Sequence, residues 1–351
     1  LIILVPLFFQ IPTAIWRNSF LKKAGLKRES FKNLLVIAIT GSYGKTSTKD
    51  FLAAILAEKF NVLKTKEHQN AEIGIAQCIL NDLKPEHQIF VCEIGAYGKG
   101  KVAEVREMIK PKIGIITGVN EQHLALFGSM ENLLSAEGGR ELVSALPEDG
   151  IAFFNGKNQY CRDLFGNTKL AKKFLYGENA PLLLENLEGA KMVARELGMS
   201  EEEISRGAEK IKNKLPGLEI RKTTSGINII DATYSANPDG VMAHLEYLKT
   251  LAGRKIIIML CLIELGSAAG EVHRRIGGKI AEVCHLAVIT TRDRFRELKQ
   301  GFIQADGRKE NILFTENPKE IFKKIREFCR SGDIVLLEGR VPNQLISLLV
   351  D

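Results

Sequence analysis

The stretch from Leu35 to Thr48 constrains the fold of this chain more than any other part. It reads Leu-Val-Ile-Ala-Ile-Thr-Gly-Ser-Tyr-Gly-Lys-Thr-Ser-Thr. The apolar run at 35–40 predicts a buried parallel strand, and the apolar spacing that follows predicts a helix at 46–59. The connecting loop has the pattern G-x-x-G-K-[ST], in which glycines let backbone N–H groups converge on a phosphate at the positive end of a helix.

This loop predicts that the chain binds ATP and Mg²⁺. The residues that we assign to it are Gly41, Ser42, Tyr43, Gly44, Lys45, Thr46 and Ser47. We expect Lys45 to contact the β- and γ-phosphates, and the hydroxyl of Thr46 or Ser47 to contact the metal ion. The alternative is an ordinary glycine-containing turn with a solvated lysine.

Strands and helices alternate along the chain on both sides of a Lys-Leu-Pro-Gly linker at 214–217. This alternation predicts an α/β fold with a mostly parallel sheet covered on both faces. We expect a central P-loop ATPase domain at 34–215 and a smaller, Rossmann-like C-terminal domain at 216–351 that lacks a G-x-G-x-x-G loop. The pattern breaks between Gly156 and Pro181. We expect residues 214–218 to act as a hinge.

Residues 1–33 form an apolar and then basic segment. Residues 1–16 are apolar but too short and too interrupted by proline to span a bilayer alone, and they begin with Leu, so we expect a longer membrane segment before them. The basic residues that follow are Arg17, Lys22, Lys23, Lys27, Arg28 and Lys32. This order predicts association with the inner face of a membrane. The alternatives are an arm packed on the domain or a remnant of a signal peptide.

Charge and cysteine usage restrict the partners and the compartment. The net charge is +7, but outside residues 17–32 the basic residues are spread out, so we expect no nucleic-acid partner. The six cysteines form no C-x-x-C pair and mostly lie in apolar runs. They predict buried thiols in a reducing, cytoplasmic compartment and no cysteine-based metal site.

Two polar residues follow predicted strands near the same edge as Lys45. Glu93 comes directly after the strand at 89–92, and His123 follows the strand at 113–117. The carboxyl ends of parallel strands form the ligand-binding edge of such sheets. A carboxylate and an imidazole there can hold a divalent cation against the γ-phosphate, although either residue alone is more typical of a surface position.

Five motifs resemble those of the Mur ligase family, in the same order. They are Thr40–Ser47, Glu67–Gly74, Glu93–Ala96, Asn120–Leu124 with Phe127–Ser129, and Thr233–Pro238. The resemblance covers residues 34–351 and is strongest to the MurF type, which joins D-alanyl-D-alanine to a UDP-linked muramoyl tripeptide.

The resemblance implies an ATP-dependent amide ligase of peptidoglycan precursor synthesis that works through an acyl phosphate. It implies catalytic roles for Lys45, Glu93 and His123, and a magnesium site formed by Thr46, Glu93 and His123. It also implies that Asn186 contacts adenine and that Asn237 lies near the nucleotide and the incoming amine. The implied substrates are a UDP-muramoyl peptide and D-Ala-D-Ala, and we expect a monomer.

Several positions depart from the family pattern. Residues 135–142 lack the family's carbamylated lysine, for which Glu137 is a candidate replacement, and Arg221 is out of register for a phosphate-binding arginine. Ala232 stands where the family has a ribose-binding aspartate, with Asp231 one position earlier. The N-terminal UDP-sugar-binding domain is absent from this sequence. Two alternatives therefore stay open: a ligase with another acceptor (cyanophycin, folylpolyglutamate or polyglutamate type), and a nucleotide-binding pseudoenzyme or scaffold.

Overall fold

The computed structural model describes residues 4–181, 183–211, 218–234 and 236–350. The linker at 214–217, and with it all of the predicted hinge except Leu218, lies outside these residues, as does Ser235 of the last motif. The chain forms two compact units. Unit 1 comprises 1–119, 129–180 and 184–213; unit 2 comprises 120–128, 181–183 and 214–351. The contiguous domain boundaries predicted from the sequence stay a proposal.

Unit 1 is built on a parallel sheet. Among the described residues the sheet has six strands, in the order β2-β3-β1-β4-β5-β6. Their bounds are Val62–Lys64, Ile89–Glu93, Leu35–Thr40, Ile113–Ile116, Ile151–Asn155 and Lys172–Tyr176, respectively. The central strand β1 pairs with β3 on one side and with β4 on the other, so the loops after these three strands leave the sheet at one edge.

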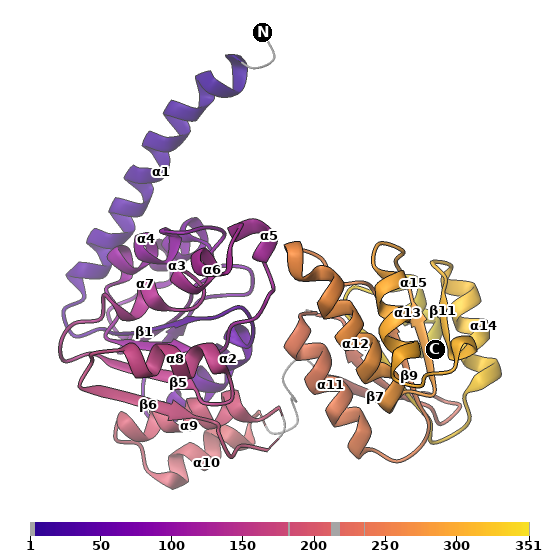
Figure 1. Cartoon of the computed structure of the whole chain (residues 1–351). Coiled ribbons are helices and arrows are strands. Elements are labelled where there is room, and N and C mark those ends of the chain that lie inside the picture. The colour runs from indigo at the N-terminus through magenta and orange to yellow at the C-terminus, as the bar shows by residue number, and fades with distance from the viewer. Residues whose placement is uncertain (1–3, 182, 212–217, 235, 351) are drawn as a thin grey trace. The chain divides into compact units, whose positions relative to one another are not determined.

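Helices cover both faces of this sheet (Figure 1). They are α1 (Leu4–Ser30), α2 (Lys45–Leu56), α3 (Glu72–Asp82), α4 (Lys101–Ile109), α6 (Met130–Ser135), α7 (Arg140–Val143), α8 (Gln159–Asn167), α9 (Glu185–Glu196) and α10 (Glu201–Glu209). Apolar residues of α2, α9 and α10 pack on one face of the strands, and residues of α7 and α8 pack on the other. Because both faces are buried, the strands read as continuous apolar runs.

Unit 2 contains a second doubly wound sheet. Its order is β11-β10-β9-β12-β8-β7, parallel except that β7 pairs antiparallel with β8. The strands are β7 (Glu219–Lys222), β8 (Asn228–Ala232), β9 (Lys255–Met259), β10 (Leu286–Ile289), β11 (Ile312–Phe314) and β12 (Ile334–Glu338). The predicted α/β fold, with a mostly parallel sheet and a second Rossmann-like sheet, is confirmed.

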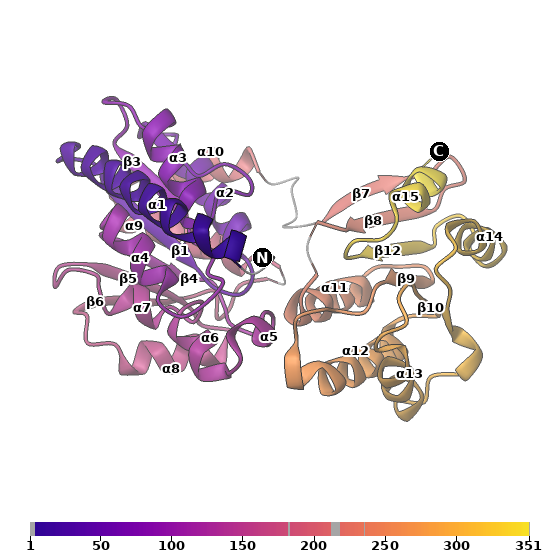
Figure 2. The same ribbon diagram turned by 90° about the horizontal axis from the view of Figure 1, so that it is seen from above.

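Two layers of helices enclose the sheet of unit 2, as Figure 2 shows. One layer consists of α11 (Pro238–Thr250), α12 (Ala269–Val283) and α13 (Phe295–Gln304), and the other of α14 (Pro318–Phe328) and α15 (Asn343–Val350). The short helix α5 (Leu124–Phe127) and the 3₁₀ turns η1 (Gly266–Ala268) and η2 (Lys309–Asn311) complete the unit.

The structure corrects one reading of the sequence. The stretch between Gly156 and Pro181, where the pattern was expected to break, contains the helix α8 and the strand β6. The sequence of β6 is Lys-Lys-Phe-Leu-Tyr, and this strand lies at the edge of the sheet. An edge strand needs no continuous apolar run, so it escapes a search for buried strands.

The N-terminal segment forms the long helix α1, which packs against α3 and α4. Its Arg17 bridges the carboxylates of Glu72 and Glu104, and its Lys27 donates to the carbonyl of Leu80. The helix continues through Pro12. The expectation that proline interrupts this segment was therefore wrong. In the part of the chain that the structure describes, no helix has the length and apolar character needed to cross a membrane.

The six cysteines are unpaired and buried, as the sequence predicted. Burial raises the pKa of the Cys78 and Cys329 thiols to about 11 and that of Cys161 to about 12. They therefore serve as small apolar core residues.

Candidate nucleotide-binding site

The loop between β1 and α2 has the backbone that a phosphate site requires. Gly41 adopts φ 146° and Gly44 adopts φ 76°, both in the region that favours glycine. A Cβ at Gly41 would lie 2.2 Å from the Thr117 hydroxyl oxygen. Gly44 is the N-cap of α2 and supplies no side-chain hydrogen bond to the first turn. The N–H groups at this helix start are therefore left for a ligand.

Lys45 folds back over the loop. Its Nζ donates to the carbonyl oxygen of Gly41 at 2.5 Å and lies 3.5 Å from that of Ser42. The ammonium group is thus held at the loop that would carry the phosphates, by contacts with neutral carbonyls that a phosphate can replace.

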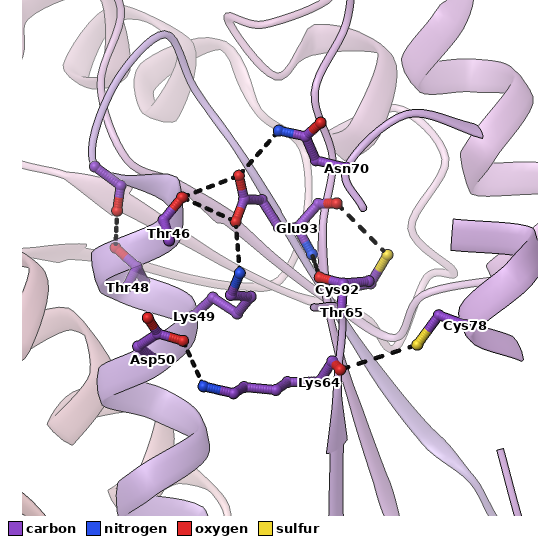
Figure 3. A network of polar contacts seen from close by, with 11 residues as sticks. Thr46, Thr48, Lys49, Asp50, Lys64, Thr65, Asn70, Cys78, Cys92 and Glu93 are labelled. Carbon is purple, nitrogen blue, oxygen red and sulfur yellow. Dashed lines mark hydrogen bonds and ion pairs between the residues drawn. The ribbon is translucent and has the colours of Figure 1, made fainter. Parts of the chain in front are cut away.

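The carboxylate of Glu93, at the end of β3, is the centre of a buried polar network (Figure 3). Thr46 on α2 donates its hydroxyl to both carboxylate oxygens, at 3.0 and 3.1 Å. Lys49, one turn further along α2, donates to Glu93 Oε2 at 3.0 Å, and Asn70 Nδ2 donates to Oε1 at 3.1 Å. The backbone N–H of Glu93 donates to the Thr65 hydroxyl at 3.1 Å.

This network keeps Glu93 ionised although its side chain is buried. Burial by itself raises the pKa of the carboxyl group, but the Lys49 ammonium, with further help from Lys45 and Asn70, lowers it to a net value below the usual 4.5. An ionised carboxylate beside a hydroxyl gives the hard oxygen donors that Mg²⁺ prefers. Thr46 and Glu93 therefore fit this metal ion.

Among the residues that the structure describes, no group of three or more His, Cys, Asp or Glu side chains is arranged to hold a metal ion. One or two protein ligands suffice for Mg²⁺ where phosphate oxygens and water complete its coordination shell.

Asn186 lies beside the phosphate loop, at the start of α9. A Cβ at Gly44 would lie 2.7 Å from Asn186 Nδ2, so this side chain lies close to the loop backbone. Asn186 is buried, and its Oδ1 has no hydrogen-bond partner among the described residues. The buried hydroxyl of Ser42 likewise has no hydrogen-bond partner among the described residues. Unpaired buried polar atoms are costly, so two of them at one loop favour a polar ligand.

Tyr43 of the loop has further structural contacts. The carbonyl of Tyr43 accepts a hydrogen bond from the Thr117 hydroxyl, and its phenol oxygen lies 3.4 Å from Asn158 Nδ2. Ser47 lies in the first turn of α2 and is half-buried. These contacts fix the loop between β1 and β4.

His123 belongs to unit 2, whereas Glu93 belongs to unit 1. His123 is the N-cap of α5 with a φ of 65°, and its Nε2 lies 3.6 Å from Glu264 Oε2. The N–H of Ala125 donates to the Glu264 carbonyl at 2.9 Å. Since the two units are described separately, a metal site shared by Glu93 and His123 stays a prediction.

The remaining predicted residues of unit 2 lie at strand ends or helix starts. Asn237 caps α11 by accepting from the N–H of Gly240 at 3.0 Å, and it also accepts from Asn120 Nδ2 at 3.0 Å. Asp231, in β8, accepts from the hydroxyl of Thr233 at 2.6 Å. Their roles toward a nucleotide stay predictions.

The two suggested replacements differ in their surroundings. Glu137 is buried in unit 1, in the stretch between α6 and α7. Arg221 lies in the edge strand β7, and its guanidinium pairs with Glu219 at 2.6 Å. Glu137 is thus a buried side chain, whereas Arg221 lies at the surface in an ion pair with Glu219.

Sequence reasoning missed Lys49 and Thr65, and it gave no role to Asn70 although that residue lies in one of the quoted motifs. The spacing of Lys49 from Lys45 places both on one side of α2, which was the available signal. The fold and this network define the class of this protein: an α/β protein with a candidate P-loop-type nucleotide site in unit 1 and a second doubly wound unit.

Comparisons with known proteins give the family. The model of the Mur ligase middle domain matches residues 39–220, and that of the Mur ligase glutamate ligase domain matches residues 218–341. The chain belongs to the Mur ligase family.

The relatives agree with the predicted resemblance. The UDP-N-acetylmuramoyl-tripeptide–D-alanyl-D-alanine ligase of Bacillus subtilis is 26% identical over 90% of this chain and 75% of its own length. The ligase of the same name from Synechocystis is 29% identical over 70% of this chain and 59% of its own length. This chain thus spans only part of these relatives.

Solved structures share the fold. The MurF of Acinetobacter baumannii gives a TM-score of 0.82 at 22% identity, over 95% of this chain and 81% of that one. The MurF ligase of Thermotoga maritima, solved in complex with ADP, gives a TM-score of 0.80 at 22% identity, over 95% and 83%.

Proposed function

We propose that this chain is an ATP-dependent amide ligase that joins D-alanyl-D-alanine to a UDP-muramoyl tripeptide in peptidoglycan precursor synthesis. The observation that carries the proposal is the Thr46–Glu93 contact at 3.0 Å, directly after a glycine loop with Lys45 at the start of α2. The names of the relatives and the ADP bound in a structure of the same fold support the choice of substrates and nucleotide.

Different residues of unit 1 bind different parts of ATP. The N–H groups at the start of α2 and the Lys45 ammonium neutralise the phosphates, because backbone donors and a cation converge there. Asn186 offers a buried, unpaired amide oxygen beside the loop, which suits the adenine amino group. Thr46 and Glu93 would hold Mg²⁺, which neutralises phosphate charge when bound. His123, Asp231 and Asn237 belong to unit 2, and their roles toward the nucleotide stay predictions.

The products distinguish this proposal from its alternatives. The decisive assay measures phosphate release with ATP, Mg²⁺ and the muramoyl tripeptide, against a panel of amines that includes D-Ala-D-Ala and glutamate. Release with D-Ala-D-Ala supports the proposal, and release only with another acceptor pair assigns a related ligase. Nucleotide binding without release under any condition identifies a pseudoenzyme.

We also propose that residues 1–33 keep the chain at the cytoplasmic face of a membrane. Ile15 and Trp16 on α1 are 65% and 59% exposed; Arg17 follows directly, and the exposed Lys22 and Lys23 lie further along the same helix. Exposed apolar side chains beside basic ones suit a lipid–water interface. Cosedimentation with anionic vesicles tests this: Ile15→Ser/Trp16→Ser should lower the bound fraction, and unchanged binding would remove the proposal.

A further inference from the structure

A basic pocket lies at the edge of the unit 1 sheet opposite to the nucleotide loop. It has a volume of about 550 Å³ and is lined by the end of α1, the end of α4 and the starts of β1 and β4, elements labelled in Figure 2. Leu35, in its wall, is the first residue of β1, whereas the phosphate loop follows the last. Six residues of strand span about 20 Å, so the two sites are separate.

The lining is strongly cationic. The residues that line the pocket include five basic side chains and one carboxylate, that of Glu107. The basic residues are Arg28, Lys32, Arg106, Lys110 and Lys112. They come from two distant parts of the chain, which the packing of α1 against α4 brings together. A concave wall with this charge concentrates anions.

Neighbouring groups satisfy only part of this charge. Lys110 pairs with Glu29, and Lys112 pairs with Asp149. Arg28 donates one terminal N–H group to the Lys110 carbonyl at 3.0 Å, and Arg106 donates one to Glu107 at 2.6 Å. A guanidinium group has five N–H donors, and a single carbonyl or carboxylate accepts from only one or two of them.

The two arginines retain buried donors. The Nε atoms of Arg28 and Arg106 are both buried and have no acceptor within the described part of the chain. Burial also lowers the pKa of Arg28, which means that the charged group lacks compensation for lost water. A buried, unpaired N–H on a charged group is costly, so an acceptor that reaches it gains binding energy.

We propose that this pocket is a second anion site, which takes the phosphate group of a ligand. The forked donors of two arginines match the oxygens of a phosphate, and three lysines supply further charge. The same chemistry is offered by a soluble phosphate or pyrophosphate and by a phospholipid headgroup. Since α1 forms one wall, a lipid held there would fix the base of this helix.

The soluble arm of the test uses pyrophosphate and calorimetry. The Lys45→Ala variant serves as the background, because it weakens binding at the phosphate loop. In that background, Arg28→Gln/Arg106→Gln should lower the affinity for pyrophosphate about tenfold or more, since each charge-assisted hydrogen bond contributes on that scale. Lys323→Gln/Lys324→Gln removes the same charge from exposed positions of α14, outside the pocket and outside α1, and should leave the affinity unchanged.

The lipid arm uses flotation of the otherwise unchanged chain with phosphatidylglycerol vesicles and with phosphatidylcholine vesicles. Binding to the anionic vesicles that falls in the arginine pair and persists in the lysine pair identifies a lipid headgroup as the ligand. Pyrophosphate binding without such a difference between vesicles identifies a soluble phosphate. Equal effects of the two pairs in both arms, or no binding in either arm, overturn the proposal.

A third variant guards against loss of folding. Lys32 is exposed, so Lys32→Glu changes the charge of the wall without removing a buried contact. This variant should weaken the binding of pyrophosphate or of anionic vesicles, whichever of the two the wild type binds. Its melting temperature should stay unchanged. Full binding by this variant together with an unfolded arginine pair would also count against the site.

Discussion

Lys49 Nζ lies 3.0 Å from Glu93 Oε2, and the two side chains are 2% and 6% exposed. Charged residues are rarely buried this completely unless they are paired. The pair joins α2 to the end of β3, next to the strand that carries the phosphate loop. Lys49 thus positions the carboxylate that Thr46 also contacts, and it keeps that carboxylate charged.

Lys49→Met should lower the free energy of unfolding by about 3–5 kcal/mol, because it leaves the Glu93 charge buried without its cation. Urea denaturation measures this. Lys64→Met is the matched control: Lys64 pairs with Asp50 on the surface, so the loss should be about 0–1 kcal/mol. A loss in Lys49→Met as small as in the control would show that the buried pair is dispensable.

Acid should reduce the difference between the wild type and Lys49→Met. In the wild type the pKa of Glu93 lies below its usual 4.5, so the stabilisation is fully present above pH 4.5 and is lost as the pH falls through the lower, folded value. Without Lys49, burial dominates and the pKa rises, so that variant gains stability on protonation. The unfolding free energies should therefore converge between about pH 7 and about pH 4. A constant gap would contradict the assigned cause.

The sequence predicted the loop, the strand before it and the carboxylate of Glu93, because each belongs to a local pattern: an apolar run, a glycine motif, a polar residue after a strand. For Lys49 the only local signal was its spacing from Lys45, which does not predict its burial beside Glu93. A lysine in a helix is usually exposed, and its burial depends on β3 lying beside β1, which no local pattern encodes. The grouping of residues 120–128 with unit 2 depends likewise on contacts between distant parts of the chain, such as Ala125 with Glu264.

The six thiols should be inert in the folded protein. Burial raises the pKa of Cys161 to about 12 and that of Cys78 to about 11, so little thiolate forms at pH 8. Titration with a thiol reagent should find fast reaction of all six cysteines only after unfolding in denaturant. Fast modification of one cysteine in the native chain would identify a site that opens locally.

Gly301→Ala should destabilise unit 2. A Cβ at Gly301, in α13, would lie 1.9 Å from the Arg274 carbonyl of α12, so the two helices would have to separate. Overpacking of this kind costs about 1–3 kcal/mol. Gly270→Ala, in α12, is the control, because its nearest atom is the end of the Arg274 side chain at 3.6 Å. Thermal melting should show a lower midpoint for Gly301→Ala alone, and equal midpoints would refute the packing argument.

Thr46→Val should weaken Mg²⁺-dependent nucleotide binding while sparing the metal-free component. The substitution keeps the shape of the side chain but removes the hydroxyl that donates to both oxygens of Glu93. Loss of a group that holds or orients a metal ligand typically lowers metal affinity about 10- to 100-fold. Titration of ADP with and without Mg²⁺ separates the two components.

Thr48→Val is the matched control for this substitution. Thr48 lies on the same helix and is buried, but its hydroxyl donates at 2.8 Å to the Gly44 carbonyl, away from the carboxylate. It should keep the Mg²⁺ dependence of the wild type, and Thr46→Ser should restore most of it because the hydroxyl returns. If Thr46→Val binds Mg²⁺ and ADP as the wild type does, then Thr46 is no metal ligand, and its contact with Glu93 serves only to join α2 to β3.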